Sequence, residues 1–534
     1  MSYREYLPPA PLLVGYDPYL DLPSDHLARF VESVVEQSIT IVTNDGEPGQ
    51  PKFDLRLLLK VLLYGYLTGV RSSRQMERLC DESLAYLFLS RGDTPSYRTL
   101  CSTRVKYAGL LEEVWTCLLA VAAEHGITRC GKIVLDSSKW RANASPDAVV
   151  KAADFVALQA ELTRILKEAE VVDRREDQED AGGTTRLGTP IKPDQMRDIV
   201  RRVRAAQAEQ SKVKSAGEAG AGPAGEAPLT ADPKLEMSSK LPASADKPVV
   251  ITRKMFGVIE AALDALKSAQ EEGLKHLCLT DPDARMMPEG REKRIRECHS
   301  FEVAVDQGLL VVAQTTSQGS DNSRLMPIID AARPFEPEGI KAVDADSGYW
   351  RGDDVASLVA SGIDTCIPDS HTACDLHRAL PVGTTKERVF SKVPMIYDPQ
   401  ADTYSCPEGN ILKLLRTTTN HGQEVKEYRA TDLCTDCPLA AVCLQQKTAK
   451  RRHLEKAVRS EQIQAVLDRF NEPEHRKRYR RRGDCVETVF GFIRSVLGIT
   501  RWQLRGSDRV AAEGKLIACA YQIRKIHSKI RAAT

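Results

Sequence analysis

The sequence predicts an α/β fold in which a mixed sheet is accompanied by helical segments. Strand-like runs at 301–306 and 309–317 are separated by two residues, which is a hairpin connection. A helix-length segment follows, and then a further β-rich run at 340–346 that ends in an acidic residue. A hairpin, a helix and another strand in succession favour a mixed sheet with helices packed on it.

Helical periodicity dominates the first part of the chain. From 51 to 111, Leu, Val, Tyr and Phe recur at three- and four-residue spacing, and Ser96 stands where a helix cap is expected. We therefore expect a helical domain over 1–128. Charge alone favours a solvated helix face, but its basic residues could also follow a phosphate backbone. These residues are Arg71, Arg74, Arg78, Arg98, Arg104 and Lys106.

The remaining chain changes character several times. A short β-rich run ending at Asp136 gives way to charged helical patterns and an Ala/Gly/Pro-rich stretch typical of disorder. After the central strands the chain is irregular and bears cysteines, and it then becomes helical and basic. The predicted segments are the first core strand at 129–148, a helical insertion at 149–280 with a disordered linker at about 217–248, core strands at 281–370, a Cys-rich insertion at 371–446, and a basic helical part of the core at 447–534.

Composition limits the class of protein. The 534 residues carry 75 basic and 74 acidic side chains, so the net charge of +1 does not itself indicate nucleic acid, and the distribution of charge matters more. No apolar run is long enough to span a membrane, and the first residues do not resemble an export signal. We expect a soluble, cytoplasmic protein whose 14 cysteines are reduced thiols or metal ligands.

Three acidic residues form the candidate catalytic set. Asp136 and Asp346 each follow a β-rich apolar run, and Glu487 lies on a predicted helix preceded by an arginine run. Carboxylates in such positions suit two divalent cations about 4 Å apart, and Mg²⁺ favours a few carboxylates plus water and phosphate oxygens. Each acid alone is a weak signal. Asp344 has the same strand parity as Asp346 and is its main rival.

The cysteines predict a metal site of another kind. The segment "CTDCPLAAVC" contains three thiols, and "YSCPEGN" supplies a fourth, which suits a tetrahedral structural Zn²⁺. The proposed ligands are Cys406, Cys434, Cys437 and Cys443. A small core of reduced thiols and an iron–sulfur cluster are alternatives, and His371 with Cys374 offers a substitute ligand. We expect Cys80, Cys101, Cys117, Cys278, Cys366 and Cys519 to be buried without a functional role.

Several motifs, in this order, resemble a bacterial insertion-sequence transposase of the DDE class. Such proteins have a ribonuclease-H-like core, and one group has a cysteine-rich insert before the catalytic Glu. The resemblance covers most of the chain. It is carried by "LLLKVLLYGYLTGVRSSRQME", "LDSSKWRANAS", "LTDPDARMM", "DSGYW", "YSCPEGN", "CTDCPLAAVC" and "VETVFGFIRSVLGITRWQLRG".

The resemblance implies roles for individual residues. Asp136, Asp346 and Glu487 would be the catalytic ligands of two Mg²⁺ (or Mn²⁺) ions, with Asp346 preferred over Asp344 because a small residue, Gly and Tyr follow it. Two departures are visible: "RECHSFEVAVD" lacks an expected Gly-Tyr pair, and Gly483 stands where related enzymes have Arg. Expected DNA contacts are Lys139, Asn143, Arg481 or Arg482, and Arg494.

The implied activity is cleavage of DNA at the terminal inverted repeats of a transposon and strand transfer into target DNA. The implied partner is double-stranded DNA, bound by a homodimer in the synaptic complex, at the nucleoid in the bacterial cytoplasm and without a membrane. A catalytically inactive or domesticated transposase that still binds DNA is the alternative. A zinc-dependent interaction module would explain the cysteines but leaves the three acids unexplained.

Overall fold

The computed structural model describes residues 17–39, 52–127, 131–179, 253–290, 292–336, 338–380, 382, 393, 395–398, 400–420, 423–444, 449–457 and 460–533. The predicted linker at about 217–248 lies outside these residues. The chain divides into two compact units, which are described separately. The first comprises Met1–Trp140 and His299–Thr534, and the second comprises Arg141–Cys298.

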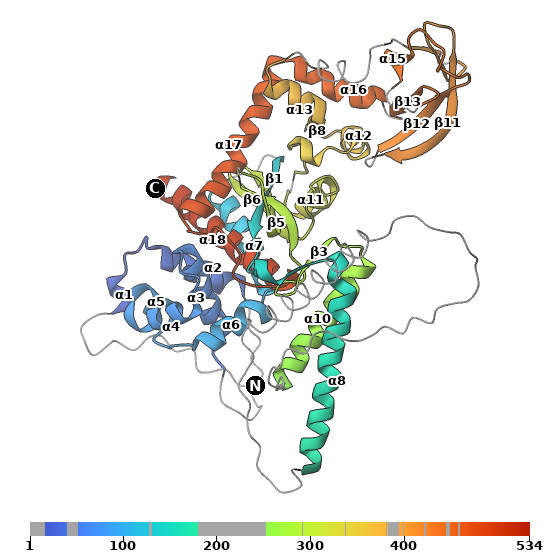
Figure 1. The fold of residues 1–534 in the computed structure, drawn as a ribbon. Helices are drawn as coiled ribbons and strands as arrows, with labels where there is room; N and C mark the ends of the chain where they lie inside the picture. Colours follow the sequence, from blue (N-terminus) through green and yellow to red (C-terminus); the bar gives the residue numbers. More distant parts are fainter. Residues whose placement is uncertain are drawn as a thin grey trace. The chain divides into compact units, whose positions relative to one another are not determined.

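Helices form the first part of the first unit, as the periodicity predicts (Figure 1). Ser96 caps one of them, because its Oγ accepts a hydrogen bond from Thr99 N at 3.2 Å. The almost wholly apolar helix α3 packs against the long C-terminal helix α18 (Ser507–Ala533). The helices are α1 (Pro18–Asp21), α2 (Leu27–Ser38), α3 (Leu55–Leu67), α4 (Ser73–Glu82), α5 (Leu84–Ser90), α6 (Tyr97–Lys106) and α7 (Leu110–Glu124).

A mixed sheet forms the centre of the first unit. Strand β1 lies between β5 and β7, β8 follows β7, and β6 pairs with β5. The β5–β6 pair is antiparallel, whereas β1, β7 and β8 run parallel. Gln307 and Gly308 join the hairpin with positive φ angles of 51° and 77°, as a two-residue turn of this kind requires. The strands are β1 (Lys132–Arg141), β5 (Arg294–Asp306), β6 (Leu309–Thr316), β7 (Ala342–Asp344) and β8 (Asp364–Cys366).

Alternation along the strands assigns the two faces of the sheet. Ile133, Leu135 and Val343 belong to a buried cluster with helices α11 (Leu325–Ala332) and α12 (Gly352–Ala360). Val134 belongs to the other cluster, together with apolar residues of α17 (Pro473–Ser495) and α18. Because side-chain direction alternates with period two, Asp136 and Asp344 project on the face covered by α17.

The predicted mixed α/β fold is confirmed, but two strand ends differ from the expectation. β1 does not end at Asp136 and continues to Arg141, whereas β7 ends at Asp344 and leaves Asp346 two residues beyond the strand. Beyond Asp136, Trp140 is buried against Phe301 with ring centroids 5.1 Å apart. The intervening residues are polar, so the apolar pattern ends before the hydrogen-bonded strand does.

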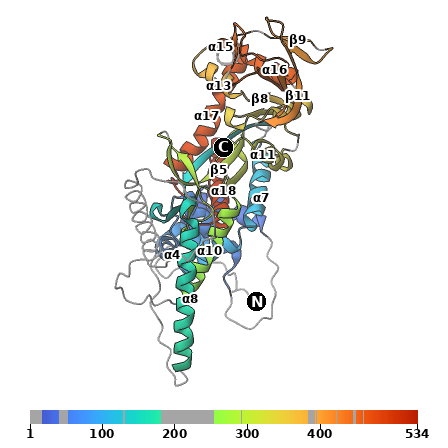
Figure 2. The same cartoon turned by 45° about the vertical axis from the view of Figure 1, so that its right-hand side comes forward.

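The second unit contains a pair of long helices, α8 (Phe155–Glu179) and α10 (Arg253–Glu271). The two lie side by side in both views (Figures 1 and 2) and share a core that includes Leu158, Leu162 and Leu266. The short strands β2 (Val149–Lys151) and β3 (His276–Cys278) pair antiparallel, and β4 (Arg285–Glu289) pairs with the first part of β5. The predicted helical insertion therefore also contains strands.

The cysteine-bearing region is a second sheet and is not irregular as predicted. Its five antiparallel strands have the order β13-β12-β11-β10-β9. The strands are β9 (Ile396–Asp398), β10 (Thr403–Ser405), β11 (Ile411–Asn420), β12 (Gln423–Ala430) and β13 (His453–Ala457), and the short helix α15 (Ala440–Cys443) follows β12. Helices α13 (Ser370–His377) and α16 (Ser460–Asp468) complete this part of the chain. None of the helices described is long and apolar enough to cross a membrane.

Candidate active site

Two of the predicted catalytic acids share one edge of the central sheet. Val134 pairs with Asp344 across the parallel β1 and β7 strands, so Asp136 and Asp346 lie two residues further along each chain in the same direction. The pKa of Asp136 is raised to about 6, chiefly by burial and next by the neighbouring charge of Asp346, against the lowering effect of Arg482. The two carboxylates therefore interact electrostatically in a region partly removed from water.

A tight turn fixes the Asp346 side chain. Asp346 caps the short 3₁₀ turn η5 (Ser347–Tyr349), and its Oδ1 accepts a hydrogen bond from Gly348 N at 2.8 Å. A Cβ at position 348 would lie 3.0 Å from Asp346 Oδ1 and 3.6 Å from Asp321 Oδ2. The absence of a side chain at Gly348 thus allows the turn to approach two carboxylates closely. Tyr349 is fully buried behind it.

A fourth carboxylate, which the sequence analysis missed, lies beside this pair. Asp321 follows β6 in the polar segment "SQGSDN", and its charge also raises the pKa of Asp136. Its Oδ1 accepts hydrogen bonds from Ser137 Oγ at 2.9 Å and from Lys139 Nζ at 2.5 Å. The available sequence signal was weak: an acid in a polar segment between a strand and a helix.

Glu487 lies on α17 and is exposed. A Cβ on Gly483 would be 3.6 Å from Glu487 Oε1, so the side chain extends back along its own helix. Within the described residues, no group of three or more His, Cys, Asp or Glu side chains is arranged to hold a metal ion. The structure thus brings Asp136 and Asp346 together but does not assemble all three acids, and the role of Glu487 stays a prediction.

Asp344, the rival of Asp346, has a different environment. It is buried, and its Oδ1 accepts a hydrogen bond from Arg478 Nε at 2.8 Å. Arg478 also forms an ion pair with Asp364 on β8. A carboxylate already paired with a guanidinium inside the protein has little capacity left for a metal ion. This environment favours Asp346 over Asp344 as the ligand.

Arginines from α17 reach the edge of the site. Arg494 Nη2 donates a hydrogen bond to Ser138 Oγ at 2.5 Å, two residues after Asp136. Arg482 stacks over the Tyr479 ring at 5.4 Å, and its charge lowers the pKa of Asp136. Arg481 is exposed on the same helix. Arg482 and Arg494 thus lie close to the candidate site, and a DNA contact by Arg481, Arg482 or Arg494 stays a prediction.

Four aromatic rings pack together beside the candidate site. Trp140 lies 5.0 Å from Trp502 between ring centroids, and Phe301 lies 5.8 Å from Trp502 and 6.4 Å from Phe490. The cluster joins β1, β5, α17 and the segment before α18. Because Phe490 is one turn from Glu487, this packing fixes the helix that carries Glu487 against the strand that carries Asp136.

Two predicted DNA contacts in the helical region require correction. Arg71 is buried, forms an ion pair with Glu513 of α18, and donates a hydrogen bond to Arg501 O at 2.8 Å. Arg104 is also buried and donates to Ser73 Oγ at 2.7 Å. Both side chains stabilise the packing of helices and are not positioned to meet phosphates.

The other residues expected to contact DNA have varied positions. Arg74 and Arg98 are exposed and lie near the Tyr97 ring, 4.8 and 5.8 Å from its centroid. Lys139 forms an ion pair with Asp321. Asn143 belongs to the second unit. A DNA contact by any of these four residues stays a prediction.

The four predicted zinc ligands line one pocket in the second sheet. Asn410 joins two of them, because its backbone N–H donates to Cys406 Sγ at 3.3 Å and its side-chain amide to Cys434 Sγ at 3.7 Å. Burial raises the pKa of the Cys443 thiol, against the effect of Arg452, and the other three cysteines contribute to the rise. The donor set fits Zn²⁺ in chemistry, but the described sulfur atoms do not stand in a metal-binding arrangement.

Among the other cysteines, Cys80, Cys278, Cys366 and Cys519 are buried as expected. Cys117 is only partly buried. Cys101 is exposed, so its predicted burial is wrong. It lies on α6, where apolar periodicity does not reveal which residues face the neighbouring helix.

Comparison with known families identifies two regions of the chain. The family described as "Transposase DDE domain" matches residues 405–527, which include the strands β11, β12 and β13, helix α17 and most of α18. The family described as "Transposase domain (DUF772)" matches residues 18–106, which contain helices α1 to α6. No curated protein and no solved structure matches the chain. The two family matches indicate an insertion-sequence transposase of the DDE class.

Proposed function

We propose that this transposase cleaves phosphodiester bonds at the terminal inverted repeats of its element and joins the released 3′-hydroxyl to target DNA, using Mg²⁺ or Mn²⁺. The observation that carries the proposal is the pair Asp136 and Asp346 at one sheet edge, with the pKa of Asp136 raised by burial and by Asp346. Carboxylates that share a site in this way are the usual ligands of divalent cations in phosphoryl transfer.

The fold of the core is part of the proposal. The sheet has an antiparallel hairpin on one side of β1 and the parallel strands β7 and β8 on the other. We assign this arrangement to a ribonuclease-H-like core, with the second unit as an insertion between β1 and β5. The first acid then lies on the central strand and the second just beyond the adjacent strand.

Each acidic residue receives a role in holding the metals. Asp136 and Asp346 would hold the cations from the sheet, and Glu487 would complete the set from α17. Bound Mg²⁺ would activate the attacking water or 3′-hydroxyl and stabilise the leaving oxygen. Asp321 keeps Ser137 and Lys139 in place beside the first ligand.

Basic residues around the edge orient the DNA. Lys139, Arg482 and Arg494 approach the site from β1 and α17. Phosphate contacts from such side chains fix the register of the duplex without reading its sequence. The exposed pair Arg74 and Arg98 on the N-terminal helices would supply further phosphate contacts. Two copies of the chain, each holding one transposon end, form the synaptic complex.

We further propose that the cysteine pocket binds a structural Zn²⁺ through Cys406, Cys434, Cys437 and Cys443. The sheet around it buries few apolar residues, chiefly Leu412 and Tyr428, so a metal would supply stability that the core does not. Zinc analysis of purified protein tests this, with Cys434→Ser as the variant. One equivalent of zinc in wild type and none in Cys434→Ser would support the site.

Cleavage of a labelled duplex that carries the element's terminal repeat tests the activity. The substrate is incubated with the full chain and Mg²⁺ or Mn²⁺, and the variants Asp136→Asn, Asp346→Asn and Glu487→Gln are compared with Arg333→Gln, an exposed control on the opposite side of the sheet. We expect cleavage and strand transfer in wild type and the control, and loss of both in the three variants with DNA binding retained. A wild type that binds the duplex but never cuts it would instead indicate a catalytically inactive DNA-binding protein.

A further inference from the structure

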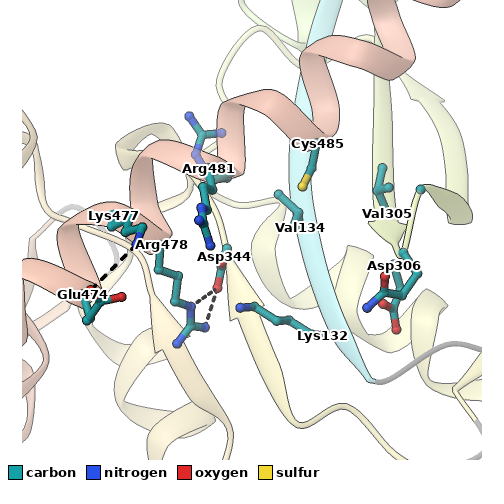
Figure 3. A pocket seen from close by; sticks show the side chains of 13 residues that line it. Lys132, Val134, Val305, Asp306, Asp344, Glu474, Lys477, Arg478, Arg481 and Cys485 are labelled. Carbon is teal, nitrogen blue, oxygen red and sulfur yellow. Dashed lines mark hydrogen bonds and ion pairs between the residues drawn. The ribbon is translucent and has the colours of Figure 1, made fainter.

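A basic pocket lies on the same face of the central sheet as Asp136 but nearer to the start of β1. Its volume is about 490 Å³, and it lies between β1, the β5–β6 hairpin and α17 (Figure 3). Val134, Val305 and Cys485 supply the apolar part of its lining. Charged side chains from β1 and α17 surround this part and converge on the same space (Figure 3).

The charges that line the pocket do not cancel. Five basic residues line it, Lys132, Lys477, Arg478, Arg481 and Arg482, against three acidic ones, Asp306, Asp344 and Glu474. Arg478 is neutralised by Asp344 together with Asp364, which lies outside the pocket. Asp306 accepts a hydrogen bond from Gly131 N at 2.8 Å. Glu474 is largely exposed and lies 3.9 Å from Lys477. The lining therefore keeps an excess of positive charge.

Two of the basic residues have no competing acid. Lys132 and Arg481 are exposed, and in the part of the chain that the structure describes neither forms an ion pair or a hydrogen bond through its side chain. They approach from different elements, Lys132 from the start of β1 and Arg481 from α17. Lys477 and Arg481 are four residues apart and so project from one side of the helix, with Cys485 one turn further.

The lining selects for phosphate and not for a base. Among the described residues that line it there is no aromatic ring on which a base could stack, and the charged side chains without an ion pair or hydrogen bond, Lys132 and Arg481, are cationic. Such a surface binds phosphate oxygens whatever the nucleotide sequence. The pocket also has a rigid link to the candidate active site, because Arg481 and Glu487 are six residues apart on α17, a rise of about 9 Å along the helix axis.

We propose that this pocket binds a phosphate of the DNA backbone, through Lys132, Lys477 and Arg481, while the strand lies across the candidate active site. The inference rests on the proposed function, since it assumes that DNA reaches the edge that Asp136 and Asp346 form. A DNA strand that is bound both in this pocket and at the candidate active site has its scissile bond positioned by α17. The source of the phosphate is a DNA strand, and a free phosphate or a mononucleotide is the competing source.

The test measures affinity of the full chain for a random-sequence 30-base-pair duplex over a range of NaCl concentrations. Lys132→Gln/Arg481→Gln is compared with wild type and with Arg333→Gln, the exposed control on the opposite side of the sheet. Each lost phosphate contact lowers the slope of log K against log salt by about 0.9. We expect the double variant, which loses the one phosphate contact of the pocket, to lose about 0.9 from the slope, with binding about tenfold weaker at low salt, and the control to match wild type.

Cleavage of the terminal-repeat duplex by the same proteins distinguishes a failure of the pocket proposal from a failure of the proposed function. We expect KM to rise in the double variant with kcat little changed, and the thermal midpoint to stay as in wild type because both side chains are exposed. If the wild type binds and cuts DNA but the double variant has the same salt slope, the pocket proposal alone is overturned. A wild type that binds no DNA would overturn the proposed function and the pocket together.

Competition identifies the source of the phosphate. Inorganic phosphate and dAMP are titrated into the duplex complex of wild type and of the double variant. Weak competition by either at millimolar concentration supports a site built for the DNA backbone. Tight binding of dAMP or phosphate by wild type, lost in the double variant while duplex affinity is unchanged, would show a small-anion site and overturn the proposal.

Discussion

Two carboxylates only two residues apart, Asp344 and Asp346, show how the same side chain acquires opposite uses. Asp344 is the last residue of β7, is buried, and is paired with Arg478. Asp346 lies on the following turn, is held by a backbone N–H, and faces Asp136, another acid. A carboxylate with its own cation contributes to the fold, whereas two neighbouring carboxylates without one form a site for a cation from outside.

The largest expected effect is the loss of cleavage activity when Asp346 is changed. Asp346→Asn removes a proposed metal ligand, and we expect cleavage of the terminal-repeat duplex to fall at least about a thousandfold, ~4 kcal/mol in the activation barrier. The thermal midpoint should change little, because the Asn side chain can still accept the hydrogen bond from Gly348 N. Activity within tenfold of wild type at saturating Mn²⁺ would show that Asp346 is not a ligand.

The paired carboxylate should respond in the opposite way. Asp344→Asn leaves Arg478 buried with less compensation, and we expect a loss of about 3 kcal/mol in the free energy of unfolding. Denaturant unfolding of the two variants measures the contrast. The remaining folded Asp344→Asn protein should still cleave DNA. If it keeps wild-type stability but loses cleavage, the roles assigned to the two aspartates are reversed.

The pKa of Asp136 makes a pH-dependent prediction. It is raised to about 6, above the ordinary value of 3.8, so the folded protein binds the proton more tightly than the unfolded chain. The contribution of Asp136 to stability is therefore present below about pH 4 and is lost as pH rises through about 6. We expect Asp136→Asn in EDTA to gain about 2 kcal/mol in unfolding free energy over wild type between these two pH values.

Unfolding curves of both proteins at a series of pH values provide the measurement, and Arg333→Gln serves as a control that should parallel wild type. A constant difference between Asp136→Asn and wild type across this range would mean that the carboxylate is not held in a strained ionised state.

The smallest effect is expected at the fourth carboxylate. Asp321→Asn keeps a hydrogen-bond acceptor for Ser137 but weakens the hold on Lys139, so we expect cleavage to fall about tenfold, ~1.4 kcal/mol. Lys139→Gln should reduce cleavage similarly, and the double variant should be no worse than either single one. Additive losses would show that the two residues act separately.

The sequence predicted those parts of the site that depend on local pattern. Asp136 and Asp346 were found because each follows an apolar β-rich run, and the hairpin was found from its two-residue connection. Asp321 was missed because its closeness to Ser137 and Lys139 is a tertiary property of a polar loop. Arg71 and Arg104 were misassigned because the charge pattern does not reveal their buried partners. Arg71 pairs with Glu513, and Arg104 donates a hydrogen bond to Ser73.

The second sheet was not predicted because its strands lack a clear alternation of apolar and polar residues. In β11 and β12 its core cluster contains Leu412, Tyr428 and Ala430, whereas the apolar residues Ile411, Leu414 and Leu415 are exposed. A small sheet of this kind is held by backbone pairing and side-chain networks. The Tyr428 hydroxyl donates a hydrogen bond to Asp402 at 2.5 Å, and Lys426 forms an ion pair with the same carboxylate at 2.9 Å.

The most direct test of the central claim is a calorimetric titration of the full chain with Mn²⁺, comparing wild type, Asp136→Asn, Asp346→Asn and Asp344→Asn. The account predicts binding by wild type and by the folded Asp344→Asn protein, and at least tenfold weaker binding when Asp136 or Asp346 is changed. Equal Mn²⁺ affinity in wild type, Asp136→Asn and Asp346→Asn would contradict the claim that these two carboxylates form the metal site.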